Sequence, residues 1–214
     1  SRVVARAGFS GAGGAFGCRV QLQAMLALLH ADQDRARRHI LIAAARQFEE
    51  GDVLHWWHPP LDRGVRTRCS DDLLWLPYVT SAFVEATGDD SILSELVPFL
   101  HAPPLVANEK DRFARFDTTS SRRSLFEHCE RALDRGFKTG AHGLPLMGSG
   151  DWNDGMNRVG EQGRGESVWL AWFMIATIKG FVRLCARRNR ADLVDRWNAR
   201  ALELQLAVEE SGWD

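Results

Sequence analysis

The sequence predicts an all-α protein. Apolar residues recur three and four positions apart in segment after segment, and no alternating apolar–polar run is long enough for a useful strand. Short connections alternate with long ones, a layout typical of helical hairpins whose long loops emerge at one end of the molecule. With 214 residues the chain has enough material for one ordinary domain, so residues 1–214 are expected to form a single unit.

Seven helices are expected, each marked by one apolar stripe. In chain order the stripes lie at 22–29, 40–48 (in a helix over roughly 33–50), 75–83, 92–96, 125–132, 169–176 (in a helix that continues to about Arg188) and 193–208. Pro77 falls inside the third stripe. Because proline is tolerated in the first turn of a helix, that helix is expected to begin near Leu76.

Composition excludes several function classes. The net charge is -1 with both signs interspersed, so neither nucleic acid nor an anionic membrane is expected as the main partner. No apolar run approaches the roughly 18 to 20 residues of a membrane span, and the first residues lack the apolar core of a signal peptide. Four scattered cysteines indicate reduced thiols, and a cytoplasmic location is expected.

Tryptophan is unusually frequent, with eight residues against one tyrosine. Trp56, Trp57, Trp152 and Trp213 fall in glycine- and proline-rich stretches rather than in helical stripes. A tryptophan in a loop either plugs the core or offers a flat apolar face to a ligand such as a sugar ring. Both uses remain open at this level.

The predicted loop 51–72 combines histidines, arginines and a pair of acids. His55 and His58 have a spacing seen in metal sites, but zinc needs three or four ligands and no third one is evident nearby, so no metal is expected. Arg66 and Arg68 could hold a phosphate through forked hydrogen bonds.

The same loop ends on two adjacent carboxylates, Asp71 and Asp72, which could accept hydrogen bonds from sugar hydroxyls. The alternative is a solvated charged loop in which Asp71 or Asp72 caps the next helix.

The long loop 139–166 contains GSGDWNDGMNR, an acid-rich turn bracketed by glycines. Asp151 and Asp154 could form a carboxylate pair, and the indole of Trp152 could raise the pKa of a neighbouring acid by excluding water. Asn153 could orient a hydroxyl group. The alternative is a turn whose side chains only satisfy backbone groups, with Asp151 as its brace.

The glycine-rich stretch 11–17 has neither the GK[ST] of a phosphate loop nor a preceding strand, so nucleotide binding is not expected.

Three segments together resemble one enzyme family: GVRTRCSDDLLWLPY (64–78), HGLPLMGSGDWNDGMNRVG (142–160) and GESVWLAWF (165–173). They are similar to the inverting disaccharide and oligosaccharide phosphorylases of the cellobiose and chitobiose phosphorylase type. HWWHPP and ATGDDSIL most resemble the phosphorylase-like C-terminal region of cyclic β-1,2-glucan synthases and the β-1,2-oligoglucan phosphorylases. The resemblance covers nearly the whole chain.

The resemblance implies an (α/α)6 toroid that cleaves or makes β-glucosidic bonds with phosphate and inversion, giving α-glucose 1-phosphate. It implies that Asp154 is the general acid and that Trp152 lines the sugar pocket. It assigns Arg66 and Asp72 to the pocket that places sugar and phosphate, with Arg68 and Asp71 as alternatives. Inorganic phosphate is expected as co-substrate, without a cofactor.

Arg19, in the segment GGAFGCRVQLQA, is also expected to bind the substrate. The family pattern for this segment is GGAFGFRDQLQD, and two of its acids are replaced here, by Val20 and Ala24. In relatives the acids at these two positions lie near the sugar. Their replacement by apolar residues is therefore expected to reduce activity. The chain is also expected to be about half of the toroid: inactive alone, with an exposed apolar face that favours self-association. In the whole protein it could belong to a larger, membrane-associated synthase.

Two other functions remain open. One is an inverting glycoside hydrolase on the same toroid. The other is a non-catalytic domain that binds glucan or controls its chain length.

Overall fold

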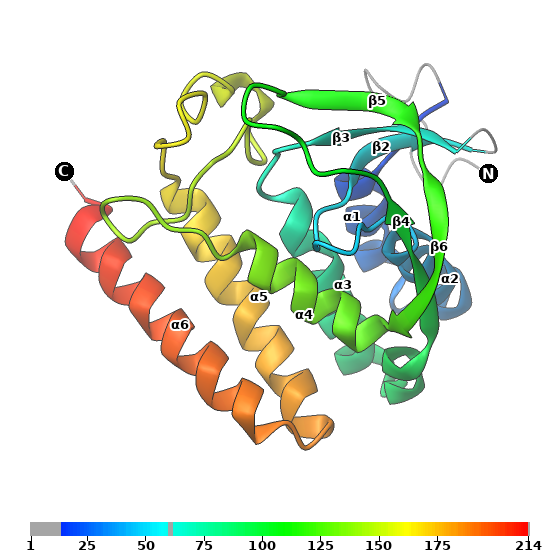
Figure 1. Ribbon diagram of the computed structural model, residues 1–214. Helices are drawn as coiled ribbons and strands as arrows, with labels where there is room; N and C mark the ends of the chain where they lie inside the picture. Colours follow the sequence, from blue (N-terminus) through cyan, green and yellow to red (C-terminus); the bar gives the residue numbers. More distant parts are fainter. Residues whose placement is uncertain (1–13, 60–61, 214) are drawn as a thin grey trace.

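The computed structural model describes residues 14–59 and 62–213, except for the side chain of Asp154. In this part of the chain helices dominate, but two antiparallel sheets are also present (Figure 1). The predicted helical fold is therefore confirmed only in part: helices predominate, but a purely all-α class is not confirmed, because two sheets accompany them. The α-helices are α1 (Cys18–Leu28), α2 (Gln33–Ala44), α3 (Asp72–Thr87), α4 (Leu125–Gly136), α5 (Val168–Arg187) and α6 (Ala191–Ser211).

The first sheet has the strand order β1-β2-β3-β5, formed by β1 (Phe16–Gly17), β2 (Leu54–His58), β3 (Arg63–Thr67) and β5 (Asp111–Arg115). The second pairs β4 (Leu96–His101) with β6 (Asp117–Ser124). Periodicity missed these strands because few carry alternating apolar residues: β5 reads DRFAR and β6 reads DTTSSRRS. Such strands are held by backbone pairing to a neighbour, which a search for apolar periods does not detect.

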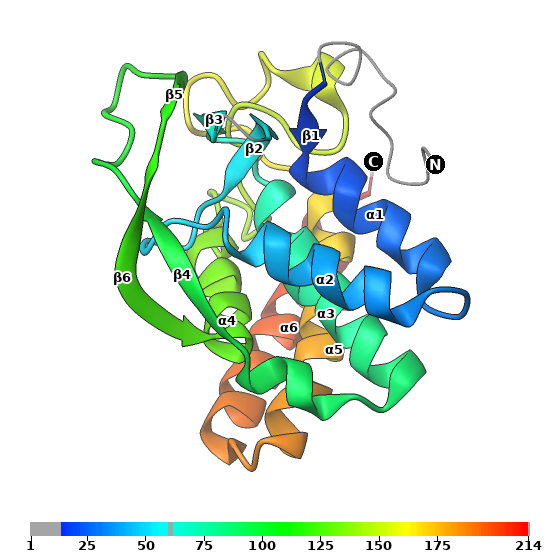
Figure 2. The same cartoon turned by 90° about the vertical axis from the view of Figure 1, so that its right-hand side faces the viewer.

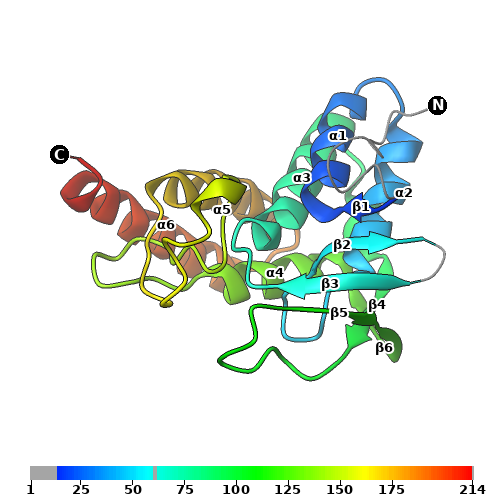
Figure 3. The same cartoon turned by 90° about the horizontal axis from the view of Figure 1, so that it is seen from above.

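The helices form one continuous layer beside the sheets. Helix α5 packs against α3 and α6, α3 also packs against α4 and α1, and α1 packs against α2 (Figures 1 and 3). Helix α5 is long and apolar enough to cross a membrane by length and composition alone, but 56% of its most apolar window is buried inside the protein. Its apolar character is therefore accounted for by its central place in the core.

Helix boundaries differ from the prediction at three places. Helix α3 begins at Asp72 rather than near Leu76, and Pro77 lies inside it. The expected short helix at 92–96 is a 3-10 helix, η2 (Asp90–Ser94), and Leu96 already opens β4. Helix α2 ends at Ala44, before the chain turns toward β2.

The long segments gather at one end of the helical layer. The segment 139–166 lies above the start of α5, at the same end of the molecule as β1, β2 and β3 (Figures 1 and 2). An isolated antiparallel bridge joins Cys69 to Gly148 and so connects the β3–α3 turn to this segment. The residues singled out in the sequence are concentrated at this end.

Candidate functional site

Three helix N-termini meet at the site. Arg19 in the first turn of α1 donates from Nη1 to Asp71, which immediately precedes α3 (3.4 Å), and to the carbonyl of Trp152 (3.2 Å). Ser167 at the N-cap of α5 completes the set through its bond to the 148–154 turn, described below. Helix N-termini direct free N–H groups and a partial positive charge toward a bound group, which favours anions.

Backbone hydrogen bonds join the β3–α3 turn to the 148–154 turn. Ser70 donates to the carbonyl of Gly150 from its N–H (2.9 Å) and from its hydroxyl (3.1 Å), and the N–H of Ser149 donates to the carbonyl of Arg68 (3.1 Å). Gly148 has φ +67, and a Cβ atom there would lie 2.0 Å from that same carbonyl oxygen. Only glycine allows the two turns to approach this closely.

Asp151 is buried and braces its own turn, as the sequence allowed. Its Oδ1 accepts from the N–H of Asn153 (2.8 Å), and its Oδ2 accepts from the hydroxyl of Ser167 (2.7 Å). Ser167 in turn accepts from the N–H of Leu170 and caps α5 (3.0 Å). The turn is thereby tied to the helix that follows it.

Asp71 occupies the N-cap position of α3 but makes no capping bond with its side chain. Its carboxylate accepts instead from Nε1 of Trp75 (3.0 Å), from Arg19 and from the thiol of Cys69 (3.4 Å). The side chain has no solvent exposure. Burial, followed by the charge of Asp72, raises the pKa of this carboxyl from 3.8 to about 6.

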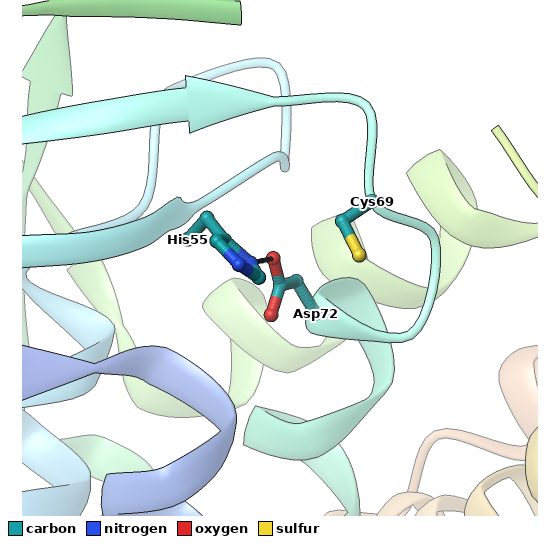
Figure 4. A group of neighbouring side chains, drawn as sticks. All are labelled: His55, Cys69 and Asp72. Carbon is teal, nitrogen blue, oxygen red and sulfur yellow. Dashed lines mark hydrogen bonds and ion pairs between the residues drawn. The ribbon is translucent and has the colours of Figure 1, made fainter. Parts of the chain in front are cut away.

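Asp72 faces His55 across the site. Nδ1 of His55 lies 2.6 Å from Oδ2 of Asp72 (Figure 4). The strand register shifts between Leu54 and Trp56, so His55 is the extra residue of a β-bulge in β2. Bulges redirect a side chain from the regular alternation of a strand, and this one directs the imidazole to the start of α3.

Trp152 projects from the 148–154 turn with its side chain 50% exposed. Its ring lies 6.2 Å from that of Trp169, which lies 5.3 Å from Phe173, which lies 4.6 Å from Trp75. The row of rings therefore runs from solvent to the indole that donates to Asp71. A half-exposed indole at the outer end provides an apolar face of the kind that a sugar ring covers.

The structure does not bring Arg66 to this site, in contrast to the expectation. Its guanidinium is fully buried, where it pairs with Asp52 (2.6 and 2.8 Å) and Glu50 (3.1 Å) and donates to the carbonyls of 102–103. It also lies 3.8 Å from the ring centre of Phe48. These contacts make Arg66 a structural link beneath the sheet.

Arg68 also points elsewhere. It is exposed and donates to the backbone carbonyls of Leu105, Val106 and Glu109, so it fastens the loop before β5. Of the arginines expected in the pocket, the structure brings Arg19 to Asp71.

The remaining predicted residues lie on the 148–154 turn and on α1. Asn153 is exposed, and its Oδ1 accepts from the N–H of Gly155 to cap the 3-10 helix η3 (Asp154–Met156). The side chain of Asp154 lies outside the described part, so its role as general acid stays a prediction. Val20, where the family pattern led us to expect an acid, is partly exposed on α1 beside Arg19.

Two site residues were not recognised from the sequence as partners of the acids. The sequence indicates His55 only as a candidate metal ligand with His58, and Cys69 only as a reduced thiol. His55 and Cys69 could have been linked to the Asp71–Asp72 pair through their positions beside β3. That link is evident only when β2 and β3 are recognised as an antiparallel hairpin.

Residues 1–214 match the catalytic domain of the Glycosyl hydrolase 94 superfamily. The chain belongs to this superfamily. Over its whole length the chain is 48% identical to cyclic β-(1,2)-glucan synthase NdvB of Rhizobium meliloti. The matched region is 8% of that protein. It is 28% identical, over 92% of the chain and 24% of the relative, to 3-O-β-D-glucopyranosyl-β-D-glucuronide phosphorylase of Paenibacillus borealis.

A third relative, N,N'-diacetylchitobiose phosphorylase of Vibrio furnissii, is 28% identical over 71% of the chain and 16% of its own length. The resemblance found in the sequence is thereby confirmed: the chain is homologous to phosphorylases and close to a cyclic glucan synthase. It spans less than a quarter of each of these three relatives.

Proposed function

We propose that this chain is part of a phosphorylase catalytic domain that cleaves or makes β-1,2-glucosidic bonds with phosphate and inversion, with α-glucose 1-phosphate as the phosphorylated product. One observation carries the proposal: Arg19, Asp71 and the backbone of Trp152, far apart in the sequence, are in contact next to residue 154. The chain is also 48% identical to a protein named as a cyclic β-(1,2)-glucan synthase. In this proposal the helices belong to an (α/α)6 toroid.

Asp154 would donate the proton to the departing glycosidic oxygen. An inverting hydrolase needs a second carboxylate to activate water, whereas phosphate is already an anionic nucleophile. The protein must therefore supply one acid and a cationic, N–H-rich environment that holds phosphate in line. The N-termini of α1, α3 and α5 would contribute N–H groups, and Arg19 would contribute the positive charge at this end of the described site.

The sugar would lie against the exposed face of Trp152. Asp72 would accept hydrogen bonds from its hydroxyl groups, because its Oδ1 is buried and has no hydrogen-bond partner in the described part of the chain. Such an unsatisfied acceptor costs about 1–3 kcal/mol, which a ligand donor would recover. Asn153 would contact the sugar from the rim.

We place this module in a larger, membrane-associated synthase, since the chain spans 8% of the matching synthase. Its partners would be a β-glucan oligosaccharide and phosphate or glucose 1-phosphate, on the cytoplasmic side.

The test uses the whole protein that contains this chain, incubated with β-1,2-oligoglucan with and without inorganic phosphate. Formation of α-glucose 1-phosphate should require phosphate and should fall by at least about 100-fold in Asp154→Asn, the scale of a lost general acid. Asp195→Asn, the same change at an exposed position of α6, should keep full activity.

Two outcomes would overturn the proposal. Sugar release that ignores phosphate would identify a hydrolase. Unchanged phosphorolysis and unchanged glucan size in Asp154→Asn would indicate a region that binds glucan without cleaving it.

A further inference from the structure

Three chemically different side chains converge beside the pocket. His55 comes from the β2 bulge, Cys69 from the β3–α3 turn and Asp72 from the first residue of α3. One ligand atom from each lies within 4.8 Å of the other two. Figure 4 shows the imidazole and the carboxylate facing each other with the thiol beside them. The sequence offered no third ligand near the two histidines, and the fold supplies Cys69 and Asp72 instead.

The donor set matches one class of ion. Imidazole nitrogen, thiolate sulfur and carboxylate oxygen are the ligands that zinc takes, whereas magnesium and calcium prefer oxygen alone. Asp71 lies next to the group, with its Oδ1 3.4 Å from the sulfur of Cys69. It could add negative charge or a further oxygen to complete a four-coordinate shell.

Asp72 gives a second, independent indication of a ligand. Its side chain is 3% exposed, and its Oδ1 is buried with no hydrogen-bond partner in the described residues. A buried carboxylate with one oxygen lacking a donor is costly, and a cation bound at Oδ2, the oxygen that faces His55, would neutralise its charge.

We propose that His55, Cys69 and Asp72 bind a thiophilic divalent cation of the zinc class. Binding replaces the thiol proton of Cys69 and the proton shared by Nδ1 of His55 and Oδ2 of Asp72, and these protons leave to solvent. As a consequence that rests on the proposed function, the cation occupies the carboxylate that the sugar needs, so metal and oligosaccharide exclude each other.

The other thiols are poor competitors for the ion. Cys18, Cys129 and Cys185 are buried, and burial raises the pKa of Cys129 and of Cys185 to about 12. The thiolate is the form that binds metal, so these cysteines should stay protonated at neutral pH. Within residues 14–59 and 62–213, the His55 group is the one set of three such ligands that lies this close together.

The experiment is a titration of the metal-free chain with Co²⁺, a spectroscopic substitute for Zn²⁺. One equivalent should produce a sulfur-to-cobalt charge-transfer band in the near ultraviolet, and Zn²⁺ should abolish it. Cys69→Ser should lose the band, and His55→Ala, which removes a direct ligand, should weaken binding by more than the roughly 10–100-fold that follows loss of an outer-shell partner.

His142→Ala is the matched control. His142 forms a similar pair with a carboxylate, with Nδ1 2.6 Å from Oε2 of Glu166, but it is not part of the thiol-containing group. This variant should keep the band. In the unaltered chain, which does not depend on the folding of any variant, Zn²⁺ should protect Cys69 from alkylation while Mg²⁺ should not.

Absence of the band, or a band that persists in Cys69→Ser, would overturn the metal site. Both readouts are independent of catalysis, so they stand even where phosphorolysis fails. In the whole protein, β-1,2-oligoglucan should weaken the apparent affinity for Zn²⁺; an unchanged affinity would overturn the mutual exclusion and leave the site itself supported.

Discussion

The buried carboxyl group of Asp71 should make the stability of this protein depend on pH. Its pKa is raised from 3.8 to about 6, first by burial and then by Asp72. The folded state therefore holds the proton more tightly than the unfolded state, and stability falls as pH rises from about 4 to about 6. Asp71→Asn removes this ionisation, so it should stabilise the protein at neutral pH and have little effect in acid.

The size of the effect follows from the two pKa values. Each pH unit between 3.8 and about 6 is worth about 1.36 kcal/mol, which gives about 3 kcal/mol at most. An asparagine still offers an oxygen to the indole of Trp75, so that neutral bond is kept. Arg19 loses its charged partner, and the observed gain is reduced by that loss.

Titration of His128 changes the stability in the opposite direction to titration of Asp71 over the same pH range. It is buried against the ring of Phe99, and burial lowers its pKa from 6.5 to about 4. Here the unfolded state holds the proton more tightly, so stability rises from about pH 4 to about pH 6.5, by about 3 kcal/mol. In the natural sequence these two dependences of stability on pH nearly cancel. In Asp71→Asn only the His128 contribution should remain, so stability should rise with pH.

The assay is urea unfolding at pH 4 and pH 7, followed by tryptophan fluorescence and far-ultraviolet circular dichroism. The advantage of Asp71→Asn over the natural sequence should grow by about 2 kcal/mol between the two pH values. His128→Gln should show the reverse trend relative to the natural sequence. An Asp71→Asn advantage that is equal at both pH values, or larger in acid, would refute the assignment of a raised pKa to this carboxyl.

Two further outcomes are expected. Gly148→Ala should destabilise the chain by more than about 2 kcal/mol in urea unfolding, because the added Cβ clashes with the carbonyl of Arg68 and the residue has a positive φ. The control Gly163→Ala, with φ +71 and open space, should cost about 1 kcal/mol. Equal losses of stability in the two variants would contradict the close approach of the two turns. The isolated chain should self-associate through exposed Leu202 and Leu206, four residues apart on α6, so light scattering should report a mass that rises with concentration and that falls in Leu202→Glu/Leu206→Glu; a monomer at all concentrations would refute this face.

The helices were largely predictable because their apolar residues follow the helical period. The stripe through Leu193, Trp197, Ala201, Leu204 and Val208 in the sequence is the buried face of α6 in the structure. The strands were not predictable, because β5 and β6 are polar and β2 contains a bulge. Their stability comes from pairing with distant partners, which no local window of sequence contains.

The candidate site divides in the same way. The family pattern identified Trp152, Asp154, Asp71, Asp72 and Arg19 as residues worth locating. Arg66 and Arg68 were expected in the pocket, but they bind carboxylate and carbonyl groups elsewhere. The sequence around an arginine in a charged segment does not indicate which of these groups it will contact.

By itself the sequence determined the helical framework, the family and the motif residues, because these depend on local periodicity and on long matching segments. Only the tertiary structure decided that His55 turns toward Asp72, that Cys69 joins them and that Asp151 braces a turn. Each of these depends on where a strand bulge, a helix start and a distant loop meet, and such a meeting is set by packing across the whole chain.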